Sequence, residues 1–280
     1  MKRVAFVVHD GRPEAIAVAT SLSRSLQEKQ VATRRLRTES IEASEVADPE
    51  DFAEGVDLVV SVGGDGTFLR SAQIANERDC PVMGVMVGRL GFLTEIEPED
   101  ALEAIEEVLA GRARIEERMA LVAESDDWPE VQWALNEVII EKGSRHRLVK
   151  LAVMVDDTKV CTFSADGVIV STSTGSTAYS FSARGPIVSP QIECLVVTPI
   201  AAHMVFDRSL VVAPSEGVSL EVVGEEPGLL SADGHESHEL PVGSVVRILP
   251  SPKPTLMVRS DGKSFFAIVR EKFGLPGGPA

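Results

Sequence analysis

Ser61-Val62-Gly63-Gly64-Asp65-Gly66-Thr67 directly follows the apolar run Leu58-Val59-Val60. This pattern predicts a strand that ends in a glycine-rich turn around one carboxylate, with a helix from about Thr67 onward. Glycine lets the backbone pass close to a bulky ligand. The N-terminus of the following helix offers N–H groups and positive partial charge to a phosphate. Asp65 is placed to accept a hydroxyl proton, so the turn points to phosphoryl transfer. An ordinary strand-to-helix turn with a solvated aspartate is the alternative that the motif alone leaves open.

Strand and helix signals alternate over the residues around this turn. Strands are predicted at 3–8, 31–37, 57–62 and 81–87, and helices at 13–29, 67–78 and 98–110. Continuous apolar strands between amphipathic helices are typical of a parallel sheet that is covered on both faces. Ligands bind such sheets at the carboxyl ends of the strands, where the turn falls. We therefore predict an α/β, Rossmann-like nucleotide-binding domain over residues 1–112.

Beyond Gly111 the pattern changes to short Val- and Ile-rich runs separated by Asp, Gly and Pro turns. These runs lie at 120–123, 133–140, 148–155, 167–171, 195–198, 209–212, 218–223, 244–249 and 255–259. Such spacing predicts a β-rich, sandwich-like second domain, which we place at residues 113–260. The remaining residues, 261–280, are predicted to form a helix at 264–273 and a disordered tail from Gly274.

Composition narrows the class of protein. The chain has 280 residues, a net charge of −16 and 44% hydrophobic residues. That charge argues against nucleic acid or an anionic membrane surface as a partner. Cys80, Cys161 and Cys194 lie far apart and read as reduced thiols. The first apolar run is broken at His9 and is too short for a signal peptide, so we expect a cytoplasmic enzyme.

Two further segments have competing interpretations. Gly84–Leu93 holds several glycines after a strand, and reads either as a plain loop or as a ligand contact. Asn136 and Glu137 interrupt an apolar strand and break its period-two pattern. A buried amide and carboxylate are costly unless they are hydrogen-bonded. Nearby backbone could satisfy both side chains, or they could hold ribose hydroxyls, which we favour.

A third segment runs from Asp166 through a series of Ser and Thr residues to Tyr179, the single tyrosine of the chain. Hydroxyl side chains suit sugar and phosphate oxygens, and the tyrosine ring offers a face to a base. An ordinary Ser/Thr-rich loop is the alternative. The His-containing segment 235–238 lacks the spacing of a zinc helix, so no metal site is predicted there.

Together these segments resemble the NAD kinase family over almost the whole chain. The turn at 63–67 alone is similar to a kinase superfamily that also includes lipid kinases and phosphofructokinases. The ordered set is Gly63–Thr67, Leu90–Leu93, Leu135–Glu137, Asp166–Gly167, Thr174–Tyr179, His203, Arg208–Leu210 and Asp233–Gly234. The resemblance implies an α/β domain, a β-rich domain, and assembly as a homodimer or homotetramer.

By this resemblance Asp65 is the proton acceptor, and Asp65, Gly66 and Arg70 line the NAD site. Asn136 and Glu137 are expected to bind ribose hydroxyls and adenine. Further dinucleotide contacts are implied for Arg147, Asp166, Thr177, Ala178, Tyr179, Ser180, Phe181, Ser182 and His235.

Some positions depart from the family's usual pattern. They are Met86, Ser164, Ser173, Arg184, Ala202 and His235, which stands where glutamine is common. None of them removes Asp65 or the Asn136-Glu137 pair. Ser164 and Arg184 affect how the dinucleotide phosphates are expected to be held.

The resemblance implies transfer of the γ-phosphoryl group of ATP to the adenosine 2′-hydroxyl of NAD, giving NADP. A divalent cation, Mg²⁺ or Mn²⁺, is expected to arrive with ATP and to neutralise phosphate charge. One alternative is a kinase for a lipid or sugar hydroxyl, which calls for an apolar trough or a basic membrane-facing patch. Another is a non-catalytic dinucleotide-binding regulator, against which the intact Asp65 counts.

Overall fold

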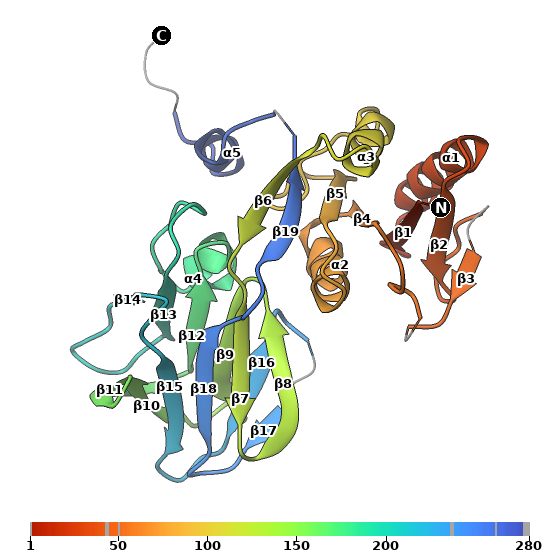
Figure 1. Cartoon of the computed structure of the whole chain (residues 1–280). Coiled ribbons are helices and arrows are strands. Elements are labelled where there is room, and N and C mark those ends of the chain that lie inside the picture. The colour runs from red at the N-terminus through yellow and green to blue at the C-terminus, as the bar shows by residue number, and fades with distance from the viewer. Residues whose placement is uncertain (1, 43–44, 50, 236–237, 261, 277–280) are drawn as a thin grey trace. The chain divides into compact units, whose positions relative to one another are not determined.

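The chain divides into two compact units, and the first is built from both ends of the sequence. The computed structural model describes residues 2–42, 45–49, 51–235, 238–260 and 262–276. Unit 1 comprises Met1–Glu117 and Thr255–Ala280, and unit 2 comprises Arg118–Pro254 (Figure 1). The division falls after Glu117 where the sequence suggested 112. Residues 255–260, assigned from sequence to the β-rich domain, lie in unit 1.

The sheet of unit 1 has the strand order of a doubly wound fold. Its strands are β1 (Arg3–Val8), β2 (Ala32–Leu36), β3 (Glu45–Ala47), β4 (Leu58–Gly63), β5 (Val82–Met86), β6 (Arg114–Arg118) and β19 (Thr255–Arg259). They lie in the order β3-β2-β1-β4-β5-β19-β6. β1 pairs in parallel with β2 on one side and β4 on the other. The junction of β1 and β4 is therefore the topological switch point, where sheets of this kind bind ligands.

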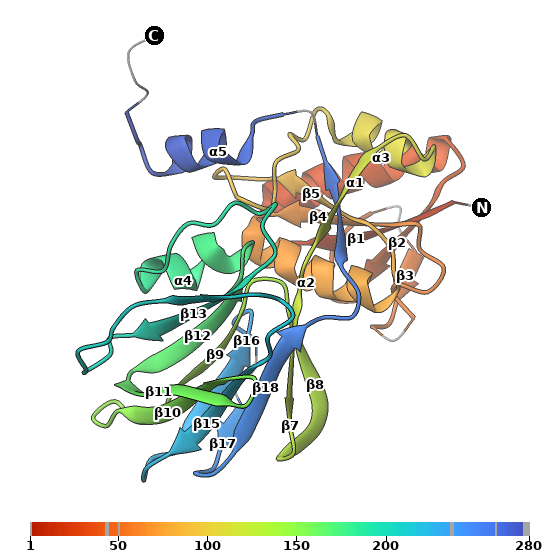
Figure 2. The ribbon, with the colours of Figure 1, turned by 60° about the vertical axis from the view of Figure 1, so that its left-hand side comes forward.

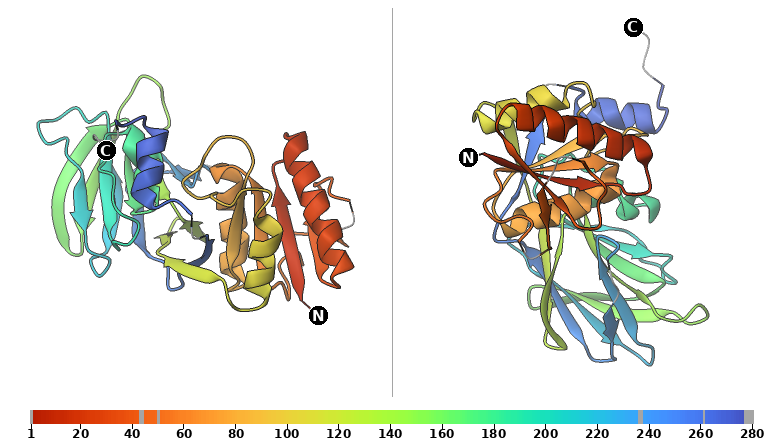
Figure 3. Two further views of the ribbon diagram at one scale, coloured as in Figure 1. Left: turned by 90° about the horizontal axis from the view of Figure 1, so that it is seen from above. Right: turned by 90° about the vertical axis from the view of Figure 1, so that its right-hand side faces the viewer.

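Helices cover both faces of this sheet. α1 (Pro13–Glu28) and α3 (Ala101–Leu109) lie on one face, and α2 (Asp65–Glu77) lies on the other (Figure 3). α1 has proline at its first turn and buries a stripe at helical spacing, namely Ala15, Ala19, Leu22 and Leu26. β4 is buried along its whole length. The predicted parallel sheet with helices on both faces is confirmed.

The strand β19 returns to the sheet beside β5, where Met257 pairs with Val82. Its last residue, Arg259, is nearly buried between two glutamates. Nη2 lies 2.9 Å from Glu95 Oε2 and Nε lies 3.2 Å from Glu116 Oε2, and the side chains of Arg259 and Glu95 are 10% and 8% exposed. This ion cluster connects β19 to β6 and to the loop after β5. The next helix, α5 (Phe265–Lys272), completes the unit.

Unit 2 is a β-sandwich. Its strands are β7 (Leu121–Ser125), β8 (Trp128–Ala134), β9 (Glu137–Lys142), β10 (Val149–Val155), β11 (Thr158–Ala165), β12 (Gly167–Thr172), β13 (Leu195–Ile200), β14 (Leu210–Val212), β15 (Val218–Val223), β16 (Gly228–Ala232), β17 (His238–Leu240) and β18 (Val245–Pro250). One sheet has the order β11-β10-β15-β18-β7-β8 and the other β14-β13-β12-β9-β16-β17 (Figure 2). Alternate residues of β15 enter the core, as in a half-buried strand. The predicted β-rich sandwich is confirmed.

The sequence run 133–140 is divided between these sheets. β8 ends at Ala134 in one sheet and β9 begins at Glu137 in the other. The bend between them contains Leu135 and Asn136. This crossing explains why the period-two pattern breaks at Asn136 and Glu137. Between the strands of unit 2, the segment after β12 forms a short 3₁₀ turn (Gly175–Thr177) and the helix α4 (Tyr179–Ser182).

The structure also bears on the expectations about membrane spans, cysteines and the C-terminal tail. Within the described residues, no helix is both long and apolar enough to cross a membrane. The three cysteines are free thiols. Of the predicted disordered tail, residues 277–279 lie outside the described part of the chain, as do residues 236–237.

We expect Arg259→Met to destabilise the protein by about 3–5 kcal/mol, because it leaves two largely buried carboxylates without their cation. Urea unfolding measures the change. The matched control is Arg112→Met, whose pair with Glu107 at 2.7 Å is on the surface, where solvent screening leaves an ion pair little effect on stability. Equal losses for the two variants would show that the buried cluster does not stabilise unit 1.

Candidate active site

A cavity of about 640 Å³ lies at the switch point of the unit 1 sheet. The end of β1 and the loop after it form one side, and the start of α2 forms the other. The lining residues are Val8, His9, Asp10, Gly11, Arg12, Gly64, Asp65, Gly66, Thr67 and Arg70. The structure thus brings together Asp65, Gly66 and Arg70, three residues that the sequence analysis assigned to one site.

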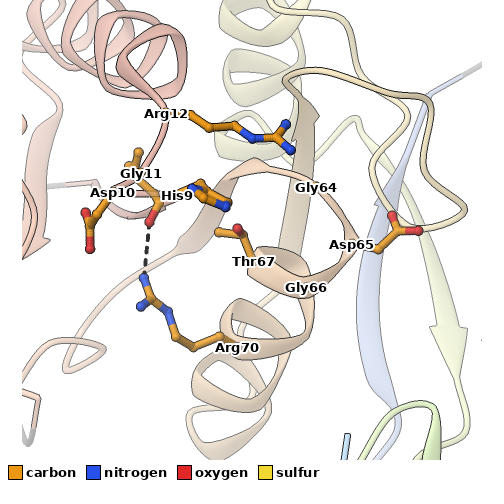
Figure 4. Close-up of a pocket in the computed structure, with 10 residues that line it drawn as sticks. His9, Asp10, Gly11, Arg12, Gly64, Asp65, Gly66, Thr67 and Arg70 are labelled. Atoms are coloured by element: carbon orange, nitrogen blue, oxygen red, sulfur yellow. Dashed lines mark hydrogen bonds between the residues drawn. The ribbon is translucent and has the colours of Figure 1, made fainter. Parts of the chain in front are cut away.

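Two arginines and a helix N-terminus contribute positive charge to this cavity, which Asp10 and Asp65 also line. The first helical hydrogen bond of α2 runs from Phe68 N to Gly64 O, so the amides of residues 65–67 stand at the open start of the helix. In the view of Figure 4, the guanidinium groups of Arg12 and Arg70 lie on opposite sides of His9 and Thr67. A helix start and two arginines suit phosphate oxygens. Neither His9 nor Arg12 was singled out from the sequence.

The Asp65 carboxylate points away from the arginines (Figure 4) and binds the loop after β5. Oδ2 accepts a hydrogen bond from Phe92 N at 2.9 Å. Oδ1 accepts from Leu93 N at 3.1 Å and from Thr94 N and Oγ1 at 3.3 and 3.4 Å. The Lys272 ammonium of α5 lies 4.0 Å from Oδ2 and 4.5 Å from the centre of the Phe92 ring. Asp65 is therefore both at the cavity and firmly oriented.

Glycines in the segment 84–93 permit this arrangement. A Cβ at Gly91 would stand 2.0 Å from Asp65 Oδ1, and a Cβ at Gly88 would stand 2.3 Å from Arg12 Nη1. Arg12 Nη1 also donates to Val87 O at 2.6 Å. The sequence analysis offered two interpretations of this segment, a plain loop or a ligand contact. In the structure the loop holds the cavity residues Arg12 and Asp65 in place.

In unit 2 an aspartate plays a similar part at the bend between β8 and β9. The Asp233 carboxylate accepts hydrogen bonds from the backbone N–H groups of Leu135 at 2.7 Å, Asn136 at 2.9 Å and Glu137 at 3.0 Å. Burial raises the pKa of Asp233, while these three amides and His235 oppose that rise. The backbone of the Asn136-Glu137 pair is thus satisfied within the protein.

The Glu137 side chain is different. The residue is 6% exposed, and its Oε2 has no hydrogen-bond partner among the described residues. Burial first, and then repulsion from Asp233, raise the pKa of Glu137 to about 8, while the backbone N–H of Tyr179 opposes the rise. Such a group is costly without a partner. A buried carboxyl with one unused oxygen is consistent with a ligand-binding role.

The Tyr179 phenol lies near three carboxyl groups, including that of Glu137. Partial burial raises the pKa of its phenol, and Glu141, Asp166 and Glu137 add to the rise. Tyr179 and Phe181 are 39% and 37% exposed, so their rings are available to a ligand. Asn136, Glu137 and the segment 177–182 therefore lie around the start of β9 and the end of β12, where Glu137 pairs with Ser171.

The hydroxyl run before Tyr179 is mostly internal. Ser171, Thr172, Ser176 and Ser180 are 0% exposed. Thr172 Oγ1 donates to Leu135 O at 2.7 Å, and Ser180 Oγ lies 3.2 Å from Thr198 Oγ1. A Cβ at Gly175 would stand 2.1 Å from Asn136 O. Thr172 thus holds the loop against the Asn136-Glu137 bend, and the more exposed positions are Thr177, Ala178, Tyr179, Phe181 and Ser182.

Three other predicted residues lie at the surface or in ion pairs. Arg147 pairs with Glu226, and its side chain is 65% exposed. Asp166 pairs with Lys142. His235 is exposed, and its backbone N–H donates to Ala232 O at 2.9 Å. Among the described residues, no group of three or more His, Cys, Asp and Glu side chains is placed to hold a metal ion.

Comparison with known protein families agrees with this geometry. Residues 4–113 match the model of the ATP-NAD kinase N-terminal domain, and residues 135–260 match that of the ATP-NAD kinase C-terminal domain. The chain belongs to the ATP-NAD kinase family.

Related proteins extend over nearly its full length. An NAD kinase of Heliobacterium modesticaldum is 39% identical over 97% of this chain and 98% of its own. An Archaeoglobus fulgidus NAD kinase, crystallised with ATP, is 27% identical over 98% of each chain, with a TM-score of 0.76. Yeast NADH kinase, crystallised with NADH, is 23% identical over 100% of this chain and 89% of its own, and its TM-score of 0.90 shows a shared fold.

The raised pKa of Glu137 predicts how this ATP-NAD kinase family member responds to pH. The folded protein keeps a proton on Glu137 up to about pH 8, whereas the unfolded chain loses it near pH 4.3. The contribution of this group to the free energy of unfolding is thus fully present below about pH 4. It is lost progressively as pH rises to about 8, the pKa in the folded protein. We therefore expect the free energy of unfolding of Glu137→Gln, relative to that of the wild type, to increase by on the order of a few kcal/mol between pH 5 and pH 9.

Urea unfolding of both proteins at several pH values measures this difference. The control is Glu225→Gln at an exposed position, for which the difference from wild type should stay flat. A flat difference for Glu137→Gln as well would contradict a buried, protonated carboxyl.

Proposed function

We propose that the chain transfers the γ-phosphoryl group of ATP to the 2′-hydroxyl of the adenosine ribose of NAD, giving NADP, with Asp65 as the proton acceptor. The observation that carries the proposal is an oriented carboxylate at the start of α2, beside a switch-point cavity that Arg12 and Arg70 line. Membership of the ATP-NAD kinase family supports the same reaction.

The hydrogen bonds of Asp65 indicate which oxygen takes the proton. A carboxylate offers about two acceptor positions on each oxygen. Oδ1 receives the donors of Leu93 and Thr94, whereas Oδ2 receives only the Phe92 amide at hydrogen-bond distance. Oδ2 therefore keeps an acceptor position for a substrate hydroxyl. Lys272, 4.0 Å away, adds positive charge beside this oxygen, a cation that the sequence analysis did not expect.

The cavity beside Asp65 suits the phosphate groups of the nucleotides. Arg12, Arg70 and the start of α2 supply donors and positive charge. A divalent cation that arrives with ATP would supply charge neutralisation on the phosphates. Asp10 also lines the cavity, and its carboxylate oxygen is the ligand type that Mg²⁺ accepts alongside substrate phosphates. In a loose phosphoryl-transfer transition state, the protein acts mainly by positioning and charge.

Unit 2 is proposed to select the dinucleotide. Asn136 and Glu137 would take ribose hydroxyls and adenine, supported by the unused Glu137 oxygen, and Tyr179 would offer its exposed ring to the base. Contacts from Arg147, Asp166, His235 and the segment Thr177–Ser182 remain predictions. We also propose that the enzyme acts in the cytoplasm as a homodimer or homotetramer, which light scattering can test.

The direct test is chromatography of NAD incubated with MgATP and the protein. We expect NADP and ADP in equal amounts, loss of turnover in excess chelator, and recovery with Mg²⁺ or Mn²⁺. No NADP under any of these conditions would refute the proposed reaction. Full turnover in the chelator would refute the role of the divalent cation.

We expect Asp65→Asn to lower kcat by about 10²–10⁴-fold, the range for a general base. Asparagine keeps the size of the side chain but does not accept the proton. Its amide NH₂ also faces a backbone donor from the loop at 92–94, so a stability loss of about 1–3 kcal/mol should accompany the change.

Calorimetric binding of NAD and a melting curve separate these two effects. Thr94→Val serves as the control, because it removes one loop contact to Asp65 and leaves the carboxylate. It should retain kcat within several-fold of wild type. Near-normal turnover of Asp65→Asn would mean that Asp65 only orders the loop.

A further inference from the structure

A buried glutamate is paired with an arginine of the switch-point cavity, and the reaction described above does not use it. Glu39 stands in the turn after β2, and its side chain is 0% exposed. Its carboxylate accepts hydrogen bonds from Val8 N at 2.9 Å, from Leu36 N at 3.3 Å and from Arg70 Nη2 at 2.8 Å. Glu39 thus joins the end of β1, its own turn and the helix α2 at one point.

The ion pair with Glu39 fixes the direction of Arg70. Arg70 Nη2 also donates to Val8 O at 3.3 Å (Figure 4), and 40% of the arginine side chain remains exposed. Of the two acceptors of Nη2, Val8 lines the same cavity as Arg70, whereas Glu39 is buried and does not line it. An arginine held in this way loses less conformational freedom when it binds an anion. The arrangement is that of a phosphate-binding arginine with a preset orientation.

The charge on Glu39 depends on pH near neutrality. Burial raises its pKa to about 7; the amide of Val8, the charge of Arg70 and the amide of Leu36 oppose the rise, and Asp10 adds to it. Arg35 of β2 donates to the backbone oxygen of Glu39. The charged groups that face Glu39 are therefore Arg70 on α2, Asp10 after β1 and Arg35 on β2. As pH rises through about 7, Glu39 becomes an anion and its hold on Arg70 strengthens.

We propose that Glu39 is a positioning residue that sets the Arg70 guanidinium to bind a phosphate group of the nucleotide in the switch-point cavity. The proposal rests on the proposed function and adds a residue that acts through another. The phosphate belongs either to the ATP chain or to the NAD pyrophosphate, since both present the same oxygens to an arginine. A purely structural role, in which Glu39 only caps the Val8 and Leu36 amides, makes different predictions.

The central experiment compares Glu39→Gln with wild type at pH 8. We expect the KM for one nucleotide to rise about tenfold, the scale for losing a hydrogen bond to a charged group, with kcat within about threefold. The substrate whose KM changes identifies the phosphate that Arg70 binds. The control is Glu42→Gln, whose glutamate is 71% exposed and pairs with Arg24 on the surface; its constants should be unchanged.

Arg70→Met and the double variant test whether Glu39 acts through Arg70. Arg70→Met alone should raise the same KM by at least as much as Glu39→Gln, and adding Glu39→Gln to it should cause no further rise. Additive effects, or an unchanged KM for both nucleotides in Glu39→Gln, would overturn the proposal. If Glu39→Gln does not fold, the comparison of Arg70→Met with wild type across pH carries the test.

The pH dependence supplies a readout that a capping role would not give. The ratio of KM for Glu39→Gln to that of wild type should approach one at pH 6 and reach its full value above pH 8. Protonation of the nucleotide is common to both proteins and cancels in the ratio. The wild-type KM should change through about pH 7 by more than the KM of Arg70→Met, which keeps only the change due to the nucleotide. A ratio that does not vary with pH would contradict the proposal.

Calorimetric binding of MgATP and of NAD gives the same comparison without turnover. Weaker binding of one of them by Glu39→Gln, but not by Glu42→Gln, supports the inference even if no NADP forms. Absence of NADP in the wild type would refute only the proposed reaction. Equal binding by wild type and Glu39→Gln, with NADP formed by both, would refute only the role of Glu39.

Discussion

A carboxylate that accepts consecutive backbone N–H groups is the interaction on which both candidate sites depend. Asp65 receives the amides of residues 92–94, and Asp233 receives those of residues 135–137. Without these aspartates, the backbone segments 92–94 and 135–137 would each have several N–H groups without acceptors, which is costly where they are buried. The two aspartates remove that cost and fix the segments around them. Neighbouring side chains such as that of Glu137 are consequently held in position while keeping polar atoms that make no structural hydrogen bond within the described part of the chain.

Much of the fold could be predicted from the sequence because its elements are strongly patterned. β1 and β4 are continuous apolar runs, and α1 carries one buried stripe, so local sequence identifies both. β19 could not be placed in the first sheet, since a short apolar strand fits either sheet and only its pairing with Val82 decides. The short strands β3 and β17 also escaped prediction, because three residues carry too little pattern.

Residues of the candidate site could be predicted where a local sequence motif contains them. Residues that reach the site only through contacts distant in the sequence could not. Asp65 stood out because it lies in a glycine-rich turn after an apolar strand, and the Asn136-Glu137 pair because it breaks an apolar run. Glu39 and Lys272 lie in polar surroundings in the sequence, and nothing local indicates that one is buried against Arg70 and the other approaches Asp65. The hydroxyl run 171–180 shows the converse. Its composition suggested ligand contacts, yet Thr172 and Ser176 donate to backbone oxygens of the protein itself, a difference that composition does not reveal.

The return of β19 and α5 to unit 1 has a consequence for protein synthesis. As the chain leaves the ribosome, the first 117 residues emerge without the strand beside β5 and without the helix that carries Lys272. Unit 2 is translated entirely in the interval, and domains generally fold as units. Unit 1 is completed only when the last residues have left the ribosome. A chain cut short by premature termination therefore lacks part of its first domain, and would expose the edge of β5 to cellular proteases.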